Sequence, residues 1–268
     1  MAAAVATALL ATSAAAVAPD DIPFVVSPDN VTLKMLEIAE VGPRDHVIDL
    51  GSGDGRIVIN AARRFGASGL GVDIVPDLVR KSRDAARAAG VAGRVEFRQQ
   101  DLYLTDLSRA TVVTMYLLPD VNLRLRPRLL AMPPGTRVVS HDWDMGAWEP
   151  DRTIEIDVPD KTHGREKRSR VHLWVVPAPV GGLWCTEGGS LTITQRFQRF
   201  SATLQEHGAP APAMVFDGRI HVRALAAEGF SVATLTLDGE RLRVDTIGPT
   251  GVAFTGKRFS RAGAQGCS

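Results

Sequence analysis

Three glycines alternate with other residues at Gly51, Gly53 and Gly55, two positions after the acid Asp49. Glycine tolerates close approach of a ligand to the backbone and backbone angles that other residues avoid. A dinucleotide fingerprint would place its third glycine at position 56, where this chain has Arg56, and no Gly-Lys-Ser/Thr of a P-loop follows. The pattern therefore argues against a phosphate ligand, and Asp49 favours a ligand that carries positive charge.

Two further acids follow the next two apolar segments. Asp73 lies near the end of the segment LGVDI, and Asp101 ends VEFRQQD. If both segments are parallel strands, their carboxyl ends lie at one edge of the sheet, where open α/β folds bind ligands. Any one of these acids could be a helix cap or a surface charge. Three of them at successive strand ends, beside a glycine loop, predict a single polar site.

The segments around these residues alternate between strand-like and helix-like patterns. Strands are expected at 47–50, 70–74, 95–101, 111–117 and 136–142, with helices between them. The first helix is expected to be capped by Ser27 with Pro28 at its first position, and the helix after residue 121 to be broken near Pro127. Segments 154–158 and 170–176 predict a terminal hairpin. The fold class is therefore α/β, with a mostly parallel Rossmann-like sheet.

The chain changes character after residue 178. Short alternating segments, including VAFTGKRF, are separated by Gly, Pro or Asp-Gly turns and predict antiparallel strands. We expect a small all-β barrel or curled sheet at 181–262, after an α/β domain at 20–178. Trp184, Phe197 and Phe200 are expected in the barrel core. Trp143 and Trp148 are expected to pack inside the α/β domain, and the alternative is that they line the mouth of a pocket.

The spacing D-x-G-x-G-x-G resembles the first motif of class I S-adenosylmethionine-dependent methyltransferases. This cofactor carries a sulfonium and an ammonium group and no phosphate, which suits Asp49. The resemblance implies that Asp73 holds the ribose hydroxyls, that Asp101 meets the adenine amine and that Leu102 flanks the ring. The cofactor-binding residues it implies are Asp49, Gly51, Ser52, Gly53, Asp54, Gly55, Asp73, Ile74, Asp101 and Leu102.

Longer segments narrow the resemblance. DIPFVVSPDNV, GVDIVPDLV, YLLPDVNLRLRPRLL and GTRVVSHDWDMGAWEPD resemble a bacterial group related to the lysine methyltransferases of the mitochondrial ATP synthase c-subunit and adenine nucleotide translocase. The resemblance covers about residues 20–177 and departs at Val26, where the group has proline. It implies a protein lysine as methyl acceptor. The alternatives are a small-molecule acceptor, or a non-catalytic envelope or binding protein on the same scaffold.

The acceptor side is expected where the fourth strand ends. Tyr116 stands there, without the Asn-Pro-Pro-Tyr type motif used on amide and base nitrogens, which argues against DNA-adenine or glutamine methylation. Tyr116, Asp142 and Phe24 are the candidate catalytic residues; the alternatives are a core tyrosine, a structural cap and a core phenylalanine. The basic loop PDKTHGREKRS is interpreted as a solvated hairpin tip, with a substrate-contacting loop as the alternative.

Other catalytic classes are excluded. Ser140, His141 and Asp142 are adjacent, and neighbouring strand side chains point to opposite faces, so they cannot form a hydrolase triad. The histidines lack the spacing of a metal site, and no metal is expected. Cys185 and Cys267 are far apart and are interpreted as incidental thiols rather than a disulfide framework.

Net charge and the N-terminal segment limit the partners and the cellular location that can be expected. The 268 residues carry 31 basic and 30 acidic side chains, so no nucleic-acid partner is expected. Residues 2–18 are apolar and end in Ala16-Val17-Ala18, which is typical of a signal or membrane-anchor segment, yet no Lys or Arg precedes them. Residues 1–19 are thus either such a segment or a disordered extension. Cofactor supply favours the cytoplasm, and the N-terminus favours export.

Overall fold

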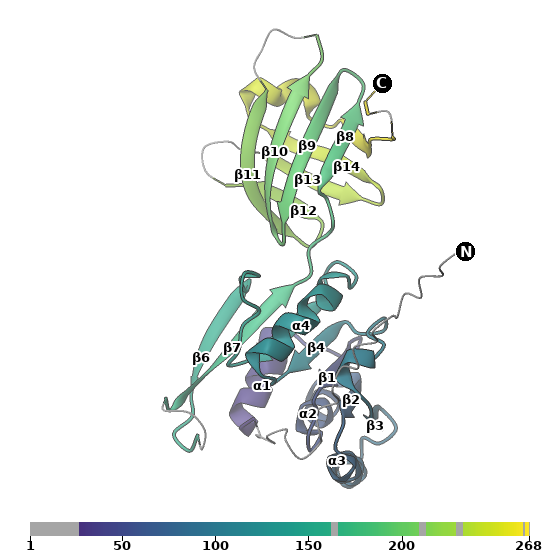
Figure 1. Ribbon diagram of the computed structural model, residues 1–268, viewed down its shortest axis with the longest axis vertical. Helices are drawn as coiled ribbons and strands as arrows, with labels where there is room; N and C mark the ends of the chain where they lie inside the picture. Colours follow the sequence, from purple (N-terminus) through teal and green to yellow (C-terminus); the bar gives the residue numbers. More distant parts are fainter. Residues whose placement is uncertain (1–26, 162–165, 209–212, 229–232, 265, 268) are drawn as a thin grey trace, which may run out of the picture.

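The computed structural model describes residues 27–161, 166–208, 213–228, 233–264 and 266–267 of the chain. Figure 1 shows an α/β part, coloured purple to teal, and a β barrel, coloured green to yellow, connected by a short segment after β7. The predicted signal-like stretch and Phe24 lie outside the described residues. Among the helices that are described, none combines the length and apolarity needed to cross a membrane.

The α/β part is built on a seven-stranded sheet with the order β3-β2-β1-β4-β5-β7-β6. Strands β1 to β5 are parallel, and β7 is antiparallel to both of its neighbours, so β6 and β7 form the predicted hairpin. The strands are β1 (His46–Leu50), β2 (Ser68–Asp73), β3 (Val95–Gln99), β4 (Val112–Met115), β5 (Arg137–His141), β6 (Arg152–Asp157) and β7 (Arg168–Val175).

Helices cover both faces of this sheet, which explains the nearly continuous apolar strands. Val47 of β1 packs with α1 and α2, whereas the next residue, Ile48, packs with α4 on the other face. Helix α3 shares the face of α2 through Val95 and Phe97. The helices are α1 (Asp29–Ile38), α2 (Arg56–Phe65), α3 (Pro76–Ala88) and α4 (Pro119–Leu130), with a 3₁₀ helix, η2, at Leu102–Leu104.

Two local predictions about helices were wrong. Helix α4 continues through Pro127, because Pro127 and the residue whose carbonyl it frees, Leu123, both lie on the exposed side while Leu125 and Leu129 are buried on the other. Pro28 occupies the N-cap position of α1, and Ser27 makes no side-chain cap. The Ser27 hydroxyl instead contacts a histidine at the site described below.

The C-terminal part is a closed eight-stranded barrel, which confirms the predicted all-β fold. Trp184 and Phe200 are buried in its core as expected. Residues 252–254 were predicted as strand and lie in a 3₁₀ helix, η3 (Pro249–Phe254), from which Phe254 packs on Gly189. The strands are β8 (Gly182–Thr186), β9 (Gly189–Arg196), β10 (Arg199–Glu206), β11 (Met214–His221), β12 (Ala224–Ala227), β13 (Ala233–Asp238), β14 (Arg241–Ile247) and β15 (Arg258–Arg261).

The two cysteines are joined by a disulfide bond, so their interpretation as incidental thiols was wrong. Closure of the barrel pairs β15 with β8, which places Ser260 opposite Cys185. The C-terminal residues that follow β15 return along β8, and the two cysteine Cα atoms lie 5.4 Å apart. Separation in sequence did not indicate this contact because the closure of the barrel creates it.

Phe197 was predicted in the barrel core and instead packs against the α/β part. It lies in the β9–β10 turn with φ +55°, and its ring stacks on buried Trp148 at a centroid distance of 6.3 Å. The neighbouring Gln198 donates to the Glu149 carbonyl at 2.7 Å. Arg219 of β11 pairs with Asp151 at 3.0 Å. The barrel is therefore fixed to the segment between β5 and β6.

Candidate active site

The glycine loop connects β1 to α2, and its three glycines have φ of +75°, +54° and +80°. This left-handed region is strained for residues with a Cβ. A Cβ on Gly55 would lie 2.7 Å from Phe97 and Ser82, and one on Gly51 would lie 2.9 Å from Leu117. The glycines are therefore required by the conformation and packing of the loop itself, a reason that precedes any ligand.

Arg56, which replaces the third glycine of a dinucleotide fingerprint, has a structural partner at each end of its guanidinium. It pairs with Asp54 at 2.7 Å and donates to the Ser27 carbonyl at 2.9 Å. Burial alone would raise the pKa of Asp54, but the hydrogen bond and charge of Arg56 outweigh it and hold that pKa below its ordinary value. Arg56 thus joins the glycine loop to Ser27, in the segment that precedes α1.

Asp49 is the most perturbed acid of the site. It lies in β1 with 2% of its surface exposed and accepts a 2.7 Å hydrogen bond from Thr114 Oγ1 of β4. Burial raises its pKa to about 7, opposed by Thr114 and reinforced by the charges of Asp73 and Asp54. A carboxyl in this state is stabilised as a carboxylate when a cation binds beside it.

The other predicted cofactor residues lie at the ends of the two neighbouring strands. Asp73 accepts from the backbone N–H of Gly53 at 2.8 Å and of Val75 at 2.9 Å, and so ties the glycine loop to the turn before α3. Half-buried Ile74 lies within that turn. Asp101 accepts from the Tyr103 N–H at 2.8 Å and caps the 3₁₀ helix that half-buried Leu102 begins.

The loop also contains a buried polar atom without a partner. Ser52 Oγ is among the few buried side-chain oxygens of the described residues that make no hydrogen bond. A buried hydroxyl costs free energy unless it is paired. The adjacent strand ends thus present a buried acid, a free hydroxyl and two turn-forming carboxylates, a donor and acceptor set that fits a cationic, hydroxyl-bearing ligand.

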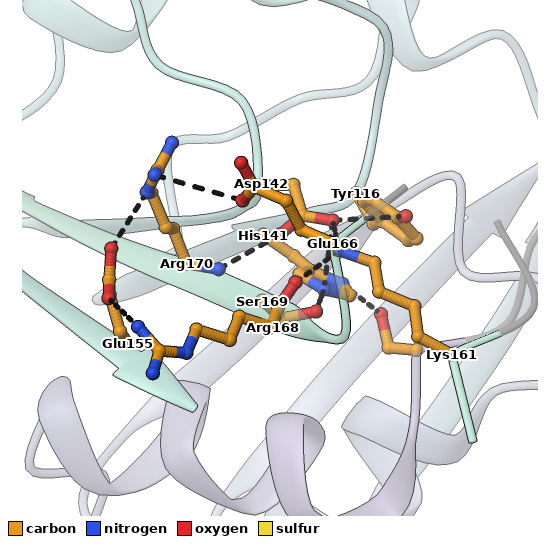
Figure 2. Close-up of polar contacts among 10 residues, drawn as sticks. Tyr116, His141, Asp142, Glu155, Lys161, Glu166, Arg168, Ser169 and Arg170 are labelled. Atoms are coloured by element: carbon orange, nitrogen blue, oxygen red, sulfur yellow. Dashed lines mark hydrogen bonds and ion pairs between the residues drawn. The ribbon is translucent and has the colours of Figure 1, made fainter. Parts of the chain in front are cut away.

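The acceptor-side candidates lie after β4 and β5 and contact one another. The Tyr116 hydroxyl donates to Asp142 Oδ2 at 3.4 Å, and Asp142 has φ +61°. Figure 2 shows the Tyr116 hydroxyl joined to this carboxylate by a dashed line. Burial raises the pKa of Tyr116 to about 12, aided by the charge and hydrogen bond of Asp142. Tyr116 therefore stays protonated and acts as a donor.

His141 positions Tyr116. Its ring stacks on the tyrosine at a centroid distance of 3.9 Å, and its two nitrogens lie 2.8 Å from Ser27 Oγ and 2.9 Å from Ser169 Oγ. Burial lowers the pKa of His141 to about 4, so the ring is neutral at pH 7. The preceding Ser140 faces away and contacts Asn122, which agrees with the exclusion of a hydrolase triad.

The sequence interpretation missed Lys161. It lies in the basic loop between β6 and β7, which was interpreted as solvated, yet its side chain is only 14% exposed. Lys161 Nζ lies 2.7 Å from Asp142 Oδ2 and donates to the Arg168 carbonyl at 2.7 Å. The predicted hairpin indicated this position, because β7 runs antiparallel to β5, so the turn that precedes β7 lies at the edge of the sheet where β5 ends.

The remaining candidates divide between packing and exposure. Trp148 is fully buried and its indole N–H makes no hydrogen bond within the described structure, whereas Trp143 is 43% exposed. Burial by itself would raise the pKa of Asp142. The hydrogen bonds from Lys161 and from the Arg170 N–H outweigh burial and hold that pKa below its ordinary value. In the described part of the chain no three acids, histidines or cysteines cluster in a way that could hold a metal.

Comparison with known proteins identifies the ligand. The sequence profile of the ANTKMT methyltransferase domain matches residues 49–152. A protein-lysine N-methyltransferase of Saccharolobus islandicus is 40% identical over 157 residues, which are 58% of this chain and 94% of that enzyme. The chain belongs to this methyltransferase family. Like its relatives, it is a methyltransferase. Its cofactor is S-adenosylmethionine, because a similar solved structure contains S-adenosyl-L-homocysteine, the form of this cofactor that remains after methyl transfer.

Two further relatives show how far the similarity extends. The mouse adenine nucleotide translocase lysine N-methyltransferase is 36% identical over 105 residues, 39% of this chain and 46% of that enzyme. A Salinibacter ruber structure, described as an RNA methyltransferase with S-adenosyl-L-homocysteine, is 52% identical with a TM-score of 0.54 and covers 58% of this chain and 96% of its own. This chain therefore covers less than half of the mouse relative. Because the chain is a methyltransferase, the alternative of a non-catalytic envelope or binding protein is rejected.

Proposed function

We propose that this methyltransferase transfers the methyl group of S-adenosylmethionine to a lysine amine of a protein. The observation that carries the proposal is the carboxylate of Asp142, which follows β5 at the sheet edge that carries the glycine loop and receives Tyr116 as a donor. A carboxylate in this position attracts and orients an ammonium group. The lysine methyltransferases among the relatives support the same acceptor.

On this proposal the chain positions two ligands. Asp49, Asp73 and Asp101 hold the cofactor, with the glycine loop beneath it and Ser52 Oγ as a further polar contact. The bound cofactor supplies an electrophilic methyl group on a sulfonium. In-line displacement at that carbon depends mainly on alignment, which the protein provides by fixing both partners.

The acceptor side has three defined roles. Asp142 orients the incoming amine, and its lowered pKa makes it a poor store for the proton, which leaves to solvent. Tyr116 donates to Asp142 and fixes the direction of its Oδ2 lone pairs. His141 remains neutral and holds the tyrosine ring by stacking. None of the three needs to act as a strong base, because the acceptor amine loses its proton to solvent and is then nucleophilic by itself.

An RNA acceptor is the second candidate, since the Salinibacter ruber structure is described as an RNA methyltransferase. A carboxylate at the acceptor position disfavours a polyanion, and the chain has 31 basic against 30 acidic side chains. A small-molecule acceptor also remains an outcome of the test. The location of the protein and the cofactor-binding assignments are likewise proposals.

The test uses radiolabelled S-adenosylmethionine, the full chain and a lysate with its RNA. We expect label that resists ribonuclease, is removed by protease and appears as methyl-lysine after hydrolysis. Asp142→Asn should lower this label at least tenfold, while Asp84→Asn, an exposed acid on α3 that pairs with Arg87, should not change it. Label confined to RNA or to small molecules would refute the lysine acceptor.

A further inference from the structure

A cation already lies on the acceptor-side carboxylate. Lys161 Nζ and the Tyr116 hydroxyl both donate to Asp142 Oδ2, at 2.7 and 3.4 Å, and the Arg168 carbonyl accepts from the same ammonium at 2.7 Å. Figure 2 shows the Lys161 side chain extending toward the others. A carboxylate, a carbonyl and a neighbouring hydroxyl form a suitable set of partners for a primary alkylammonium group.

Lys161 differs from its basic neighbours in burial. Arg168 and Arg170 have side chains 63% and 52% exposed and pair with Glu155 on the surface of the hairpin. Lys161, in the loop that precedes β7, is 14% exposed. Its long apolar stem allows the charge to reach the sheet edge from the hairpin turn. Lysine side chains are rarely buried unless they are paired, so its position depends on Asp142.

The carboxylate is preset for this cation by the backbone. Asp142 Oδ1 accepts from the Arg170 N–H at 2.9 Å, and its own N–H donates to the Arg170 carbonyl at 2.7 Å. The residue has φ +61°, a left-handed conformation that a non-glycine residue adopts with strain. These contacts fix the carboxylate and leave Oδ2 directed at Lys161 and Tyr116. The strained backbone therefore serves the orientation of one oxygen.

We propose that Asp142 Oδ2, the Tyr116 hydroxyl and the Arg168 carbonyl form a binding site for a primary alkylammonium group, and that Lys161 is its intramolecular occupant. The identity of the external ligand rests on the proposed function: an acceptor lysine enters by displacing Lys161 from Asp142. Lys161 is then a competitor of the substrate and not a catalytic residue, and its removal opens the site.

The first experiment measures binding without catalysis. n-Butylammonium is titrated by calorimetry into the full chain and its variants. Lys161→Ala should bind it at least tenfold more tightly than wild type, and the added Asp142→Asn substitution should abolish the gain. Lys161→Met, which keeps the apolar stem, guards against misfolding. Lys34→Ala removes an exposed lysine paired with Glu37 on α1 and should behave as wild type. Equal affinity in all variants would overturn the proposal.

The second experiment measures competition during methyl transfer, with poly-L-lysine as acceptor. Lys161→Ala should lower KM for poly-L-lysine severalfold with little change in kcat, and Lys161→Arg should keep the wild-type KM. An unchanged or higher KM for Lys161→Ala would contradict displacement. If no variant methylates poly-L-lysine, the lysine-acceptor proposal fails by itself, and the n-butylammonium titration still decides whether the ammonium site exists.

Discussion

Replacement of Asp49 by asparagine should stabilise the ligand-free protein while removing cofactor binding. Asparagine keeps the shape of the side chain and an oxygen that accepts from Thr114 Oγ1, but it removes a buried charge. The pKa of Asp49 is raised from 3.8 to about 7, chiefly by burial. At 1.36 kcal/mol per pKa unit, ionising this group in the folded state costs on the order of 4 kcal/mol.

The sign follows from proton binding. Well below pH 3.8 Asp49 is protonated in both the folded and the unfolded chain, and the variant should equal wild type. Between pH 4 and 7 only the folded state retains the proton, so wild-type stability falls as pH rises through the folded pKa. Above pH 8 the full difference is present. Asp49→Asn should then be more stable by up to about 4 kcal/mol.

The assay is urea unfolding from pH 4 to 8.5, with S-adenosylhomocysteine titration by calorimetry at pH 8. We expect the stability gain to grow through this range and the affinity for S-adenosylhomocysteine to fall at least tenfold. Asp77→Asn, an exposed acid in the first turn of α3, serves as control and should change neither. A gain that does not vary with pH would refute the reasoning, because the effect then would not come from a buried ionisation.

Three other predictions concern the loop, the histidine and the barrel. Gly55→Ala forces a φ of +80° on alanine and a Cβ 2.7 Å from Phe97, so it should cost more than about 1 kcal/mol of stability and weaken cofactor binding, measured by urea unfolding and calorimetry. His141 has a folded pKa of about 4, so its contribution to stability should be lost as pH falls from 6.5 to 4, and His141→Phe should flatten this dependence. Reduction of Cys185–Cys267 should lower the stability of the barrel by about 2–4 kcal/mol in chemical denaturation, and a Cys185→Ser, Cys267→Ser variant should not respond to reductant.

Local patterns predicted where the three candidate cofactor-binding acids lie in the fold. Asp49, Asp73 and Asp101 each follow a short apolar segment, and parallel pairing of those segments brings the three to one edge. The pattern could not show that Asp73 ties the glycine loop to the next turn, because that contact depends on the left-handed conformation of the loop. Glycine spacing alone indicated a tight loop and left its cause open.

Contacts between segments that are distant in the chain could not be predicted from the sequence. In the sequence, Lys161 is one of several charged residues in a basic loop. It contacts Asp142 only because the hairpin turn lies at the edge of the sheet where β5 ends. Phe197 alternates correctly for a barrel core, but a turn residue with φ +55° leaves the alternation. The disulfide depends on barrel closure. The domain limits at 20–178 and 181–262 stay predictions.

The segment between β5 and β6 belongs to both parts of the protein. It begins with Asp142 and ends with Trp148, Glu149 and Asp151, on which Phe197, Gln198 and Arg219 of the barrel rest. Exchange of this barrel for that of another protein would remove the aromatic ring from Trp148 and the cation from Asp151. A chimera that keeps this α/β part therefore needs a new turn with an aromatic residue and a cation at these two places, or substitutions of Trp148 and Asp151 that suit a free surface.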